Sequence, residues 1–139
     1  WHHGCHVVDA ALWLLGADAA DEVRAQFGPP HADLGIPLDL DITFRAGERL
    51  VTVAMSYNSP WPQHDYFVIG EETALDFRDG KLLGPDGVVH DGSGAENSIL
   101  EQDREWIYAI REDREPAVNV DAVLPAMRVL QAAQEQMRG

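Results

Sequence analysis

The chain has 139 residues, of which 45% are hydrophobic, and its formal net charge is −14. This length and composition suffice for one globular domain with its own core, so we expect residues 1–139 to form a single domain. The negative charge argues against nucleic acid or anionic lipid as a partner, because both are bound through basic surfaces. No apolar run is long enough to cross a bilayer. A single cysteine, Cys5, excludes an intramolecular disulfide and is compatible with a cytoplasmic location.

A helix is predicted over about residues 3–15, with Gly16 as its C-terminal cap. At about 100° per residue, two separate faces of this helix have different characters. The apolar face, which we expect to pack on a core, carries Val8, Ala11, Leu12 and Leu15. The second face carries His2, His6, Asp9 and Trp13. The first helix is therefore expected to pack through one side and to offer polar chemistry on the other.

The middle of the sequence alternates between apolar and polar residues, which is typical of strands. Strands are predicted at residues 22–27, 38–44, 50–57, 65–69, 73–77, 81–83 and 88–90. In the third of these, one apolar face carries Val51, Val53, Met55 and Tyr57. In one interpretation this face is exposed and pairs with a second copy of the chain.

Two helices are predicted to close the chain, at about residues 98–111 and 122–137. Asp121 is the expected N-cap of the last helix, with Pro125 in its first turn. Trp106, Ile107 and Met127 are expected in the core. The order of elements predicts an α+β fold, with a largely antiparallel or mixed open sheet and helices packed on one of its faces.

Three histidines, His2, His3 and His6, fall within the first six residues. The unperturbed pKa of histidine lies closer to neutral pH than that of any other side chain, so the cluster suggests proton transfer or metal ligation. His2 and His6 stand four residues apart and could bind a metal ion, with Asp9 or His3 as third ligand. The residues alone do not distinguish proton transfer from metal ligation.

The start of the chain resembles the beginning of the C-terminal domain in the Gfo/Idh/MocA oxidoreductases. It has Gly4-x-His6-x-x-Asp9, followed by an apolar helix that ends in Trp-Leu-Leu-Gly at residues 13–16. Later features agree in order, namely a sheet region with a turn at Gly70, the segment 115–118 (Glu-Pro-Ala-Val) and a last helix from Asp121. The resemblance covers nearly the whole chain. It implies the C-terminal half of a two-domain architecture like that of glyceraldehyde-3-phosphate dehydrogenase.

The resemblance also implies a function. His6 matches the catalytic histidine of the family, which implies a general base for hydride transfer from a carbinol carbon of a sugar-like or carboxylated hydroxy compound to NAD or NADP. The family usually has an acidic residue where this chain has His2. His-His-Gly at this place is similar to the branch of 4-carboxy-2-hydroxymuconate-6-semialdehyde dehydrogenases, which implies a carboxylated substrate. The candidate substrate-binding residues are His2, His3, Asp9, Tyr57 and Asn58.

No G-x-G-x-x-G motif follows a predicted strand in this sequence. We therefore expect the Rossmann domain and most of the NAD(P) site to belong to another part of a longer protein. Because the chain begins at Trp1, we expect it to be a piece of that protein and to be inactive alone. Two other hypotheses remain, a histidine-based metal site and a non-catalytic dimerisation module. The family resemblance is compatible with a homo-oligomer assembled through the sheet.

Overall fold

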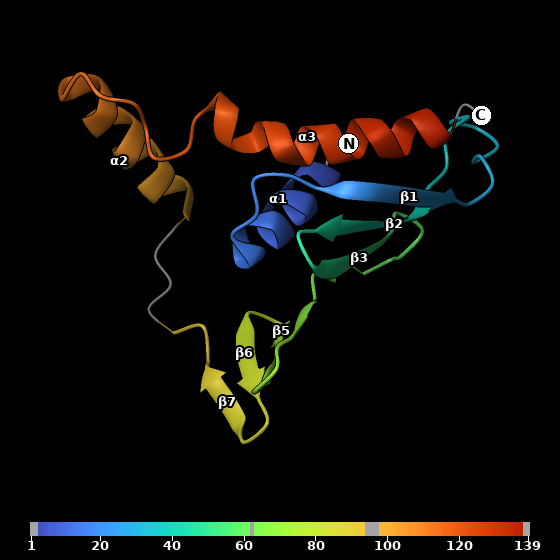
Figure 1. Ribbon diagram of the computed structural model, residues 1–139, viewed down its shortest axis with the longest axis horizontal. Helices are drawn as coiled ribbons and strands as arrows, with labels where there is room; N and C mark the ends of the chain where they lie inside the picture. Colours follow the sequence, from blue (N-terminus) through green and yellow to red (C-terminus); the bar gives the residue numbers. More distant parts are fainter. Residues whose placement is uncertain (1–2, 62, 94–97, 138–139) are drawn as a thin grey trace. The chain divides into compact units, whose positions relative to one another are not determined.

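The computed structural model describes residues 3–61, 63–93 and 98–137, and confirms the predicted α+β class (Figure 1). The elements, in chain order, are α1 (Gly4–Leu15), β1 (Asp21–Phe27), β2 (Asp39–Ala46), β3 (Arg49–Ser56), β4 (Tyr66–Ile69), β5 (Ala74–Arg78), β6 (Lys81–Gly84), β7 (Gly87–His90), α2 (Ser98–Arg111) and α3 (Val120–Gln136). The predicted elements are all present, with bounds close to those expected. Within these described ranges, no helix is both long and apolar enough to cross a membrane.

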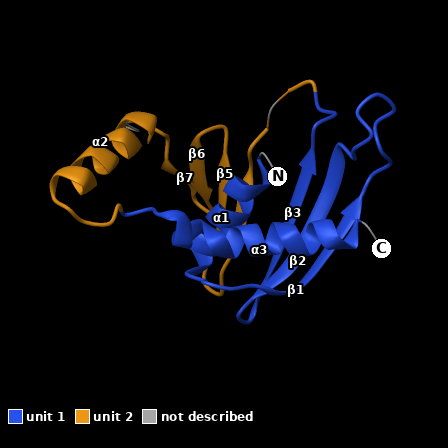
Figure 2. Cartoon of the chain, turned by 90° about the horizontal axis from the view of Figure 1, so that it is seen from above, with its two compact units in different colours: residues 1–59, 117–139 blue, residues 60–116 orange. Residues whose placement is uncertain are grey.

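The chain divides into two compact units (Figure 2). Unit 1 comprises residues 1–59 and 117–139, and unit 2 comprises residues 60–116. Unit 1 contains α1, α3 and a three-stranded sheet in the order β1-β2-β3. Unit 2 contains α2 and a four-stranded sheet in the order β4-β5-β6-β7. Strand pairing is antiparallel in both sheets, as hairpin connections of this length require.

The core of unit 1 lies between its sheet and its two helices. Helix α3 contacts β1, α1 contacts β3, and the two helices contact each other on one face of the sheet (Figures 1 and 2). The buried core comprises Val8, Leu12, Ile42, Phe44, Ala46, Val53, Ala126, Val129, Leu130 and Ala133. Burying each large apolar side chain of this set contributes about 1.5–3 kcal/mol to folding.

The two predicted faces of α1 are confirmed for the described residues, whereas His2 lies outside them. Val8 and Leu12 are buried in the core, whereas Trp13 is 78% exposed on the other side of the helix. Gly16 adopts a left-handed conformation, with φ of 61°, and closes the helix as expected. The Gly16 and Ala17 amides donate to the carbonyls of Trp13 and Leu12, which satisfies the last turn of the helix.

The prediction of an exposed apolar face on β3 is wrong. Val53 is buried in the core, and Val51 and Met55 pack against it, because α1 and α3 cover this face of the sheet. Tyr57 follows the last residue of β3 and is 46% exposed. The open face of β3 instead carries small and polar side chains, those of Thr52, Ala54 and Ser56.

The start of α3 also differs from the prediction. Asn119, not Asp121, is the N-cap, and its Oδ1 accepts a hydrogen bond of 3.1 Å from the amide of Ala122. Asp121 lies in the first turn, where its negative charge is favourable next to the helix N-terminus. Pro125 lies inside the helix, beyond the first turn. Asn119 has the extended backbone of an N-cap residue, with φ of −119° and ψ of −176°, so the helix begins before the predicted cap.

In unit 2, Trp106 and Ile107 were expected in a core but are 60% and 51% exposed. The buried residue of α2 is Ala109, which lies three residues after Trp106. The amide of Arg114 donates to the Ala109 carbonyl, and Asp113 takes a left-handed conformation with φ of 51°. Helix α2 is therefore closed by local backbone geometry and not by burial of its large apolar side chains.

Candidate functional site

The start of α1 and the end of β3 meet at the surface of unit 1. The backbone amide of His3 donates to Tyr57 Oη at 3.3 Å. The imidazole of His3 also stacks on the phenol ring, with ring centroids 5.6 Å apart and an interplanar angle of 9°. The structure thus brings together two residues that sequence analysis selected separately, although they lie far apart in the sequence.

Gly4 allows the first turn of α1 to sit directly on the core. It is buried, and a Cβ atom at this position would lie 3.0 Å from Leu130 Cδ2 and 3.4 Å from Met55 Cε. Contacts this short require the ends of the Leu130 and Met55 side chains to shift, so a larger residue at position 4 would crowd the packing of the helix start on the core. The glycine of the predicted motif therefore holds the residues on either side of it close to the end of β3.

His6 lies in the first turn of α1 and is exposed, as a proton acceptor for an outside molecule must be. Asp9 is half-buried nearly one turn later along the helix. The structure shows no hydrogen bond between His6 and Asp9, both of which lie in its described part. The orienting role of Asp9 and the catalytic role of His6 stay predictions.

His2 lies outside the described residues, so its substrate and metal-binding roles stay predictions too. Within residues 3–61, 63–93 and 98–137, no group of three or more His, Cys, Asp or Glu side chains is placed to hold a metal ion. His3 faces the ring of Tyr57 in this range, as its stacking geometry shows.

Asn58 has a structural partner that sequence analysis did not anticipate. Its Nδ2 donates to Asp39 Oδ2 at 2.7 Å, and its backbone amide donates to Ser56 Oγ at 3.1 Å. The Ser56 hydroxyl donates to Asp39 Oδ1 at 2.6 Å. The amide group of Asn58 is thus directed to Asp39. The hairpin register pairs Asp39 with Ser56, so the pattern of two paired strands was the signal that could have found this contact.

A shallow groove of about 460 Å³ lies on the open face of the unit 1 sheet, next to Asp39. All three strands contribute to its lining, which consists of Gln26, Phe27, Gly28, Asp39, Leu40, Asp41, Ala54, Met55 and Ser56. Two carboxyl groups make this groove electrostatically unfavourable for an anion. The groove therefore does not suit the carboxylated substrate that the sequence implies.

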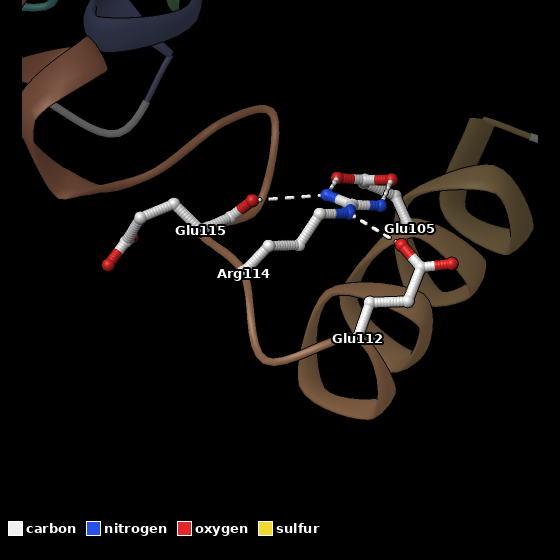
Figure 3. A network of polar contacts seen from close by, with 4 residues as sticks. All are labelled: Glu105, Glu112, Arg114 and Glu115. Carbon is white, nitrogen blue, oxygen red and sulfur yellow. Dashed lines mark hydrogen bonds and ion pairs between the residues drawn. The ribbon is translucent and has the colours of Figure 1, made fainter.

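Unit 2 has a pocket of about 310 Å³ at the end of α2, with the side chain of Arg114 in its wall. The other lining residues are Trp106, Ala109, Ile110, Asp113 and Pro116. The Arg114 guanidinium forms two hydrogen bonds to the carboxylate of Glu105, of 2.7 and 2.9 Å, and one of 2.8 Å to Glu112 (Figure 3). These carboxylates raise the pKa of Arg114 above its already high ordinary value. Because most of its donors are used within the chain, this arginine is not poised to bind an outside anion.

Residues 1–90 match the sequence profile of a family described as "Bacterial oxidoreductases, C-terminal". A curated relative, 4-carboxy-2-hydroxymuconate-6-semialdehyde dehydrogenase from Sphingobium sp., is 34% identical over 143 residues, which cover 99% of this chain and 44% of the relative. The resemblance to that branch, first seen in the His-His-Gly segment, is thereby confirmed.

Solved structures of dehydrogenases share the fold. A dehydrogenase from Clostridium difficile superposes with a TM-score of 0.74 at 16% identity, and the match covers 95% of this chain and 46% of that one. The WlbA dehydrogenase from Bordetella pertussis, solved with NADH and UDP-GlcNAcA, gives a TM-score of 0.74 at 17% identity, with coverage of 98% and 41%. The chain thus spans less than half the length of these proteins and of the curated relative.

Proposed function

Because the chain belongs to the C-terminal domain family of bacterial oxidoreductases, of the Gfo/Idh/MocA type, we propose that it is the substrate-side domain of an NAD(P)-dependent dehydrogenase with His6 as general base. The observation that carries this proposal is the position of His6. It is exposed on the first turn of α1, on a helix whose opposite face is fixed in the core by Val8 and Leu12. A base on such a rigid element keeps a defined position relative to a substrate.

The proposed substrate is a hydroxy or hydrated aldehyde compound that carries a carboxylate. The curated relative is named for a carboxylated semialdehyde, and the similarity covers 99% of this chain and 44% of the relative. Histidine at positions 2 and 3 supports this choice, because an imidazole can carry a positive charge whereas an acidic residue would repel the substrate. His3 and Tyr57 are the proposed substrate contacts at the described edge of the site, and His2 and Asp9 are proposed as further contacts.

The nicotinamide ring, when bound, would accept the hydride. Dinucleotide binding in a Rossmann fold uses parallel strands and a helix N-terminus to receive the pyrophosphate. The described part of this chain has antiparallel sheets instead and does not fit that group. We therefore assign most of the NAD(P) contacts to other parts of the protein, and no cofactor contact to residues of this chain. In this proposal residues 1–139 act as one substrate-side domain that does not turn over alone.

The proposed step on this chain is a proton transfer. One imidazole nitrogen of neutral His6 accepts the proton of the substrate hydroxyl while the C–H bond of the same carbon breaks and its electron pair leaves as hydride. The carbon becomes a carbonyl, and His6 becomes an imidazolium that later releases its proton to water. Asp9, nearly one turn along α1, would stabilise the imidazolium by its negative charge.

We also propose that the protein assembles as a homo-oligomer in the cytoplasm. The apolar side of β3 is used by the core, so the surface available for pairing is the open face of the β1-β2-β3 sheet. The single cysteine is consistent with a reducing compartment. Sedimentation of the protein would test the assembly, and a monomer at high concentration would contradict it.

The test of the catalytic proposal is His6→Ala in the full-length protein. Oxidation of 4-carboxy-2-hydroxymuconate-6-semialdehyde is followed through the formation of NADH or NADPH. Loss of a general base should lower kcat by about 10²–10⁴-fold and remove the acidic limb of the pH–rate profile. Added imidazole should restore part of the activity, because it can take the place of the missing base.

His31→Ala is the matched control, since His31 is also an exposed histidine of unit 1 but lies in the loop before β2. Its turnover should equal that of the unmodified protein. Unchanged NAD(P)-dependent turnover in His6→Ala would eliminate His6 as the base. Equal losses in both histidine variants would instead indicate a general effect on folding.

A further inference from the structure

Asp39 is held at the start of β2 from two directions. Its carbonyl oxygen accepts the amide of Gly28 at 2.8 Å, which ties it to the end of β1. A Cβ atom at position 28 would lie only 3.1 Å from Asp39 Cβ, so the close approach of the two strands depends on glycine there. Contacts of the main chain therefore hold the backbone of Asp39 in place independently of its carboxylate.

Both carboxylate oxygens of Asp39 are used, and their partners lie on either side of Tyr57. Ser56 Oγ donates to Oδ1 at 2.6 Å, and Asn58 Nδ2 donates to Oδ2 at 2.7 Å. A carboxylate is an acceptor through both oxygens, so one side chain can hold two donors at once. Asp39 therefore clamps the residues immediately before and after Tyr57.

This clamp acts where regular pairing stops. β3 ends at Ser56, and the next backbone bond across the pair is from the Tyr57 amide to the Leu38 carbonyl, at 2.8 Å. Beyond it the chain enters the loop that contains Pro60. The side-chain contacts of Asp39 extend the order of the strand to Asn58, one residue past Tyr57, whose ring stacks on His3.

We propose that Asp39 is a positioning residue of the histidine site, which acts through Ser56 and Asn58 to hold Tyr57 against His3. This inference rests on the proposed function for its effect on catalysis, but its effect on geometry is independent of any reaction. The phenol ring contacts His3 both at the backbone amide and at the imidazole, so its placement fixes the start of α1. A misplaced Tyr57 would loosen the helix turn that carries His6.

The geometry of the clamp predicts which substitutions matter. Asp39→Ala removes both acceptors and frees the end of β3. Asp39→Asn keeps one carbonyl oxygen as acceptor, so it should hold one of the two donors and give an intermediate result. Asp41→Ala is the matched control, because Asp41 lies on the same strand and the same groove, and no contact of its side chain joins it to residues 56–58 among those the structure describes.

The first readout is the chemical shift of the His3 ring signals in the NMR spectrum of the full-length protein, labelled with ¹³C-histidine. Stacking on Tyr57 shifts the His3 ring signals, and Tyr57→Ala defines their value without the stack. Asp39→Ala should move these signals towards the Tyr57→Ala value, Asp39→Asn should move them part of the way, and Asp41→Ala should leave them in place. If Asp39→Ala does not fold, Asn58→Ala removes one arm of the clamp and should give the intermediate shift.

The second readout is turnover of 4-carboxy-2-hydroxymuconate-6-semialdehyde, where Asp39→Ala should lower kcat/KM about tenfold through a misplaced site. His3 signals that stay at the unmodified value in Asp39→Ala, or that move equally in Asp41→Ala, would overturn the positioning role. If the signals move as expected while His6→Ala keeps full activity, the clamp stands and the proposed base is wrong. If the signals stay while His6→Ala is inactive, the base stands and the clamp is wrong.

Discussion

Units 1 and 2 are stabilised by different kinds of interaction. Among the residues that the structure describes, ten buried hydrophobic side chains form the core of unit 1, whereas unit 2 contributes Ala109. Large apolar side chains of unit 2 are mostly exposed, among them Phe67 at 65% and Ile69 at 77%. Unit 2 instead uses strand pairing and ion pairs, such as that of Arg78 with Asp76 at 3.2 Å.

This difference explains why the candidate site lies in unit 1. A proton acceptor must be held in place, and burial provides that rigidity better than exposed ion pairs do, since the latter contribute little in water. Regions with few buried apolar contacts open more readily. We therefore expect unit 1 to resist unfolding strongly and unit 2 to open at low cost, a contrast that substitutions can test.

The largest expected effect separates two phenylalanines. Phe44 is fully buried in the unit 1 core, and Phe44→Ala should lower the free energy of unfolding by about 3–5 kcal/mol, through lost burial and a cavity. Phe67→Ala, at an exposed position of β4, should change it by less than about 0.5 kcal/mol. Urea unfolding followed by circular dichroism measures both. Similar losses in the two variants would show that unit 2 has a packed core after all.

The two helix ends allow a comparison of equivalent positions. In α1 the amides of residues 16 and 17 donate to the carbonyls of residues 13 and 12, and in α2 residues 113 and 114 donate to residues 110 and 109. The left-handed position is Gly16 in one and Asp113 in the other, with φ of 61° and 51°. Only glycine adopts this conformation without strain from a Cβ atom.

Gly16→Ala should therefore cost about 1 kcal/mol, and because nothing lies within 4 Å of a Cβ there, the cost is conformational and not steric. Asp113→Gly should relieve a similar strain and stabilise the end of α2 by somewhat less than about 1 kcal/mol, since glycine also gains freedom when unfolded. Urea unfolding measures the first, and amide hydrogen exchange in α2 measures the second. Faster exchange in Asp113→Gly would mean that the aspartate itself holds the turn.

Local patterns in the sequence predicted the elements well, since helix and strand periods are set by the residues themselves. The apolar face of α1 with Val8 and Leu12 is an example. A period of two shows that β3 has two faces, but it cannot show which face is covered. The assignment of Val53 to an exposed surface failed for this reason. Trp106 was placed in a core because of its residue type, whereas the structure leaves it exposed.

The candidate site was predictable only in part for a related reason. His6 and Tyr57 were selected because of residue type and position along the chain. The contact of His3 with Tyr57 joins residues 54 positions apart, and it depends on how α1 packs on β3. Asp39 carried no chemical signal of its own in the sequence, because its significance comes from the two donors that the hairpin register places opposite it.

The smallest expected effect concerns the hydrogen bonds between Asp91 and Ser93, and it tests whether unit 2 is stabilised by local polar contacts. Hydrogen bonds from the Ser93 side chain and backbone lower the pKa of Asp91 below its ordinary value of 3.8, and the backbone bond measures 2.8 Å. Since the pKa is lower in the folded chain, this contact adds stability above about pH 4, and the stability is lost as the pH falls through the folded pKa. Ser93→Ala keeps the backbone bond but removes the hydroxyl.

The pKa of Asp91 in Ser93→Ala should therefore rise towards 3.8 without reaching it, as measured by carboxyl ¹³C titration. Ser93→Thr, which retains a hydroxyl, should keep the pKa of Asp91 low. Neither change should alter the urea unfolding of unit 1, because Asp91 and Ser93 belong to unit 2 and its order is local. If Ser93→Ala shifts the urea midpoint as Phe44→Ala does, the two units unfold together. The units would then differ in the exposure of their apolar side chains but not in their resistance to unfolding.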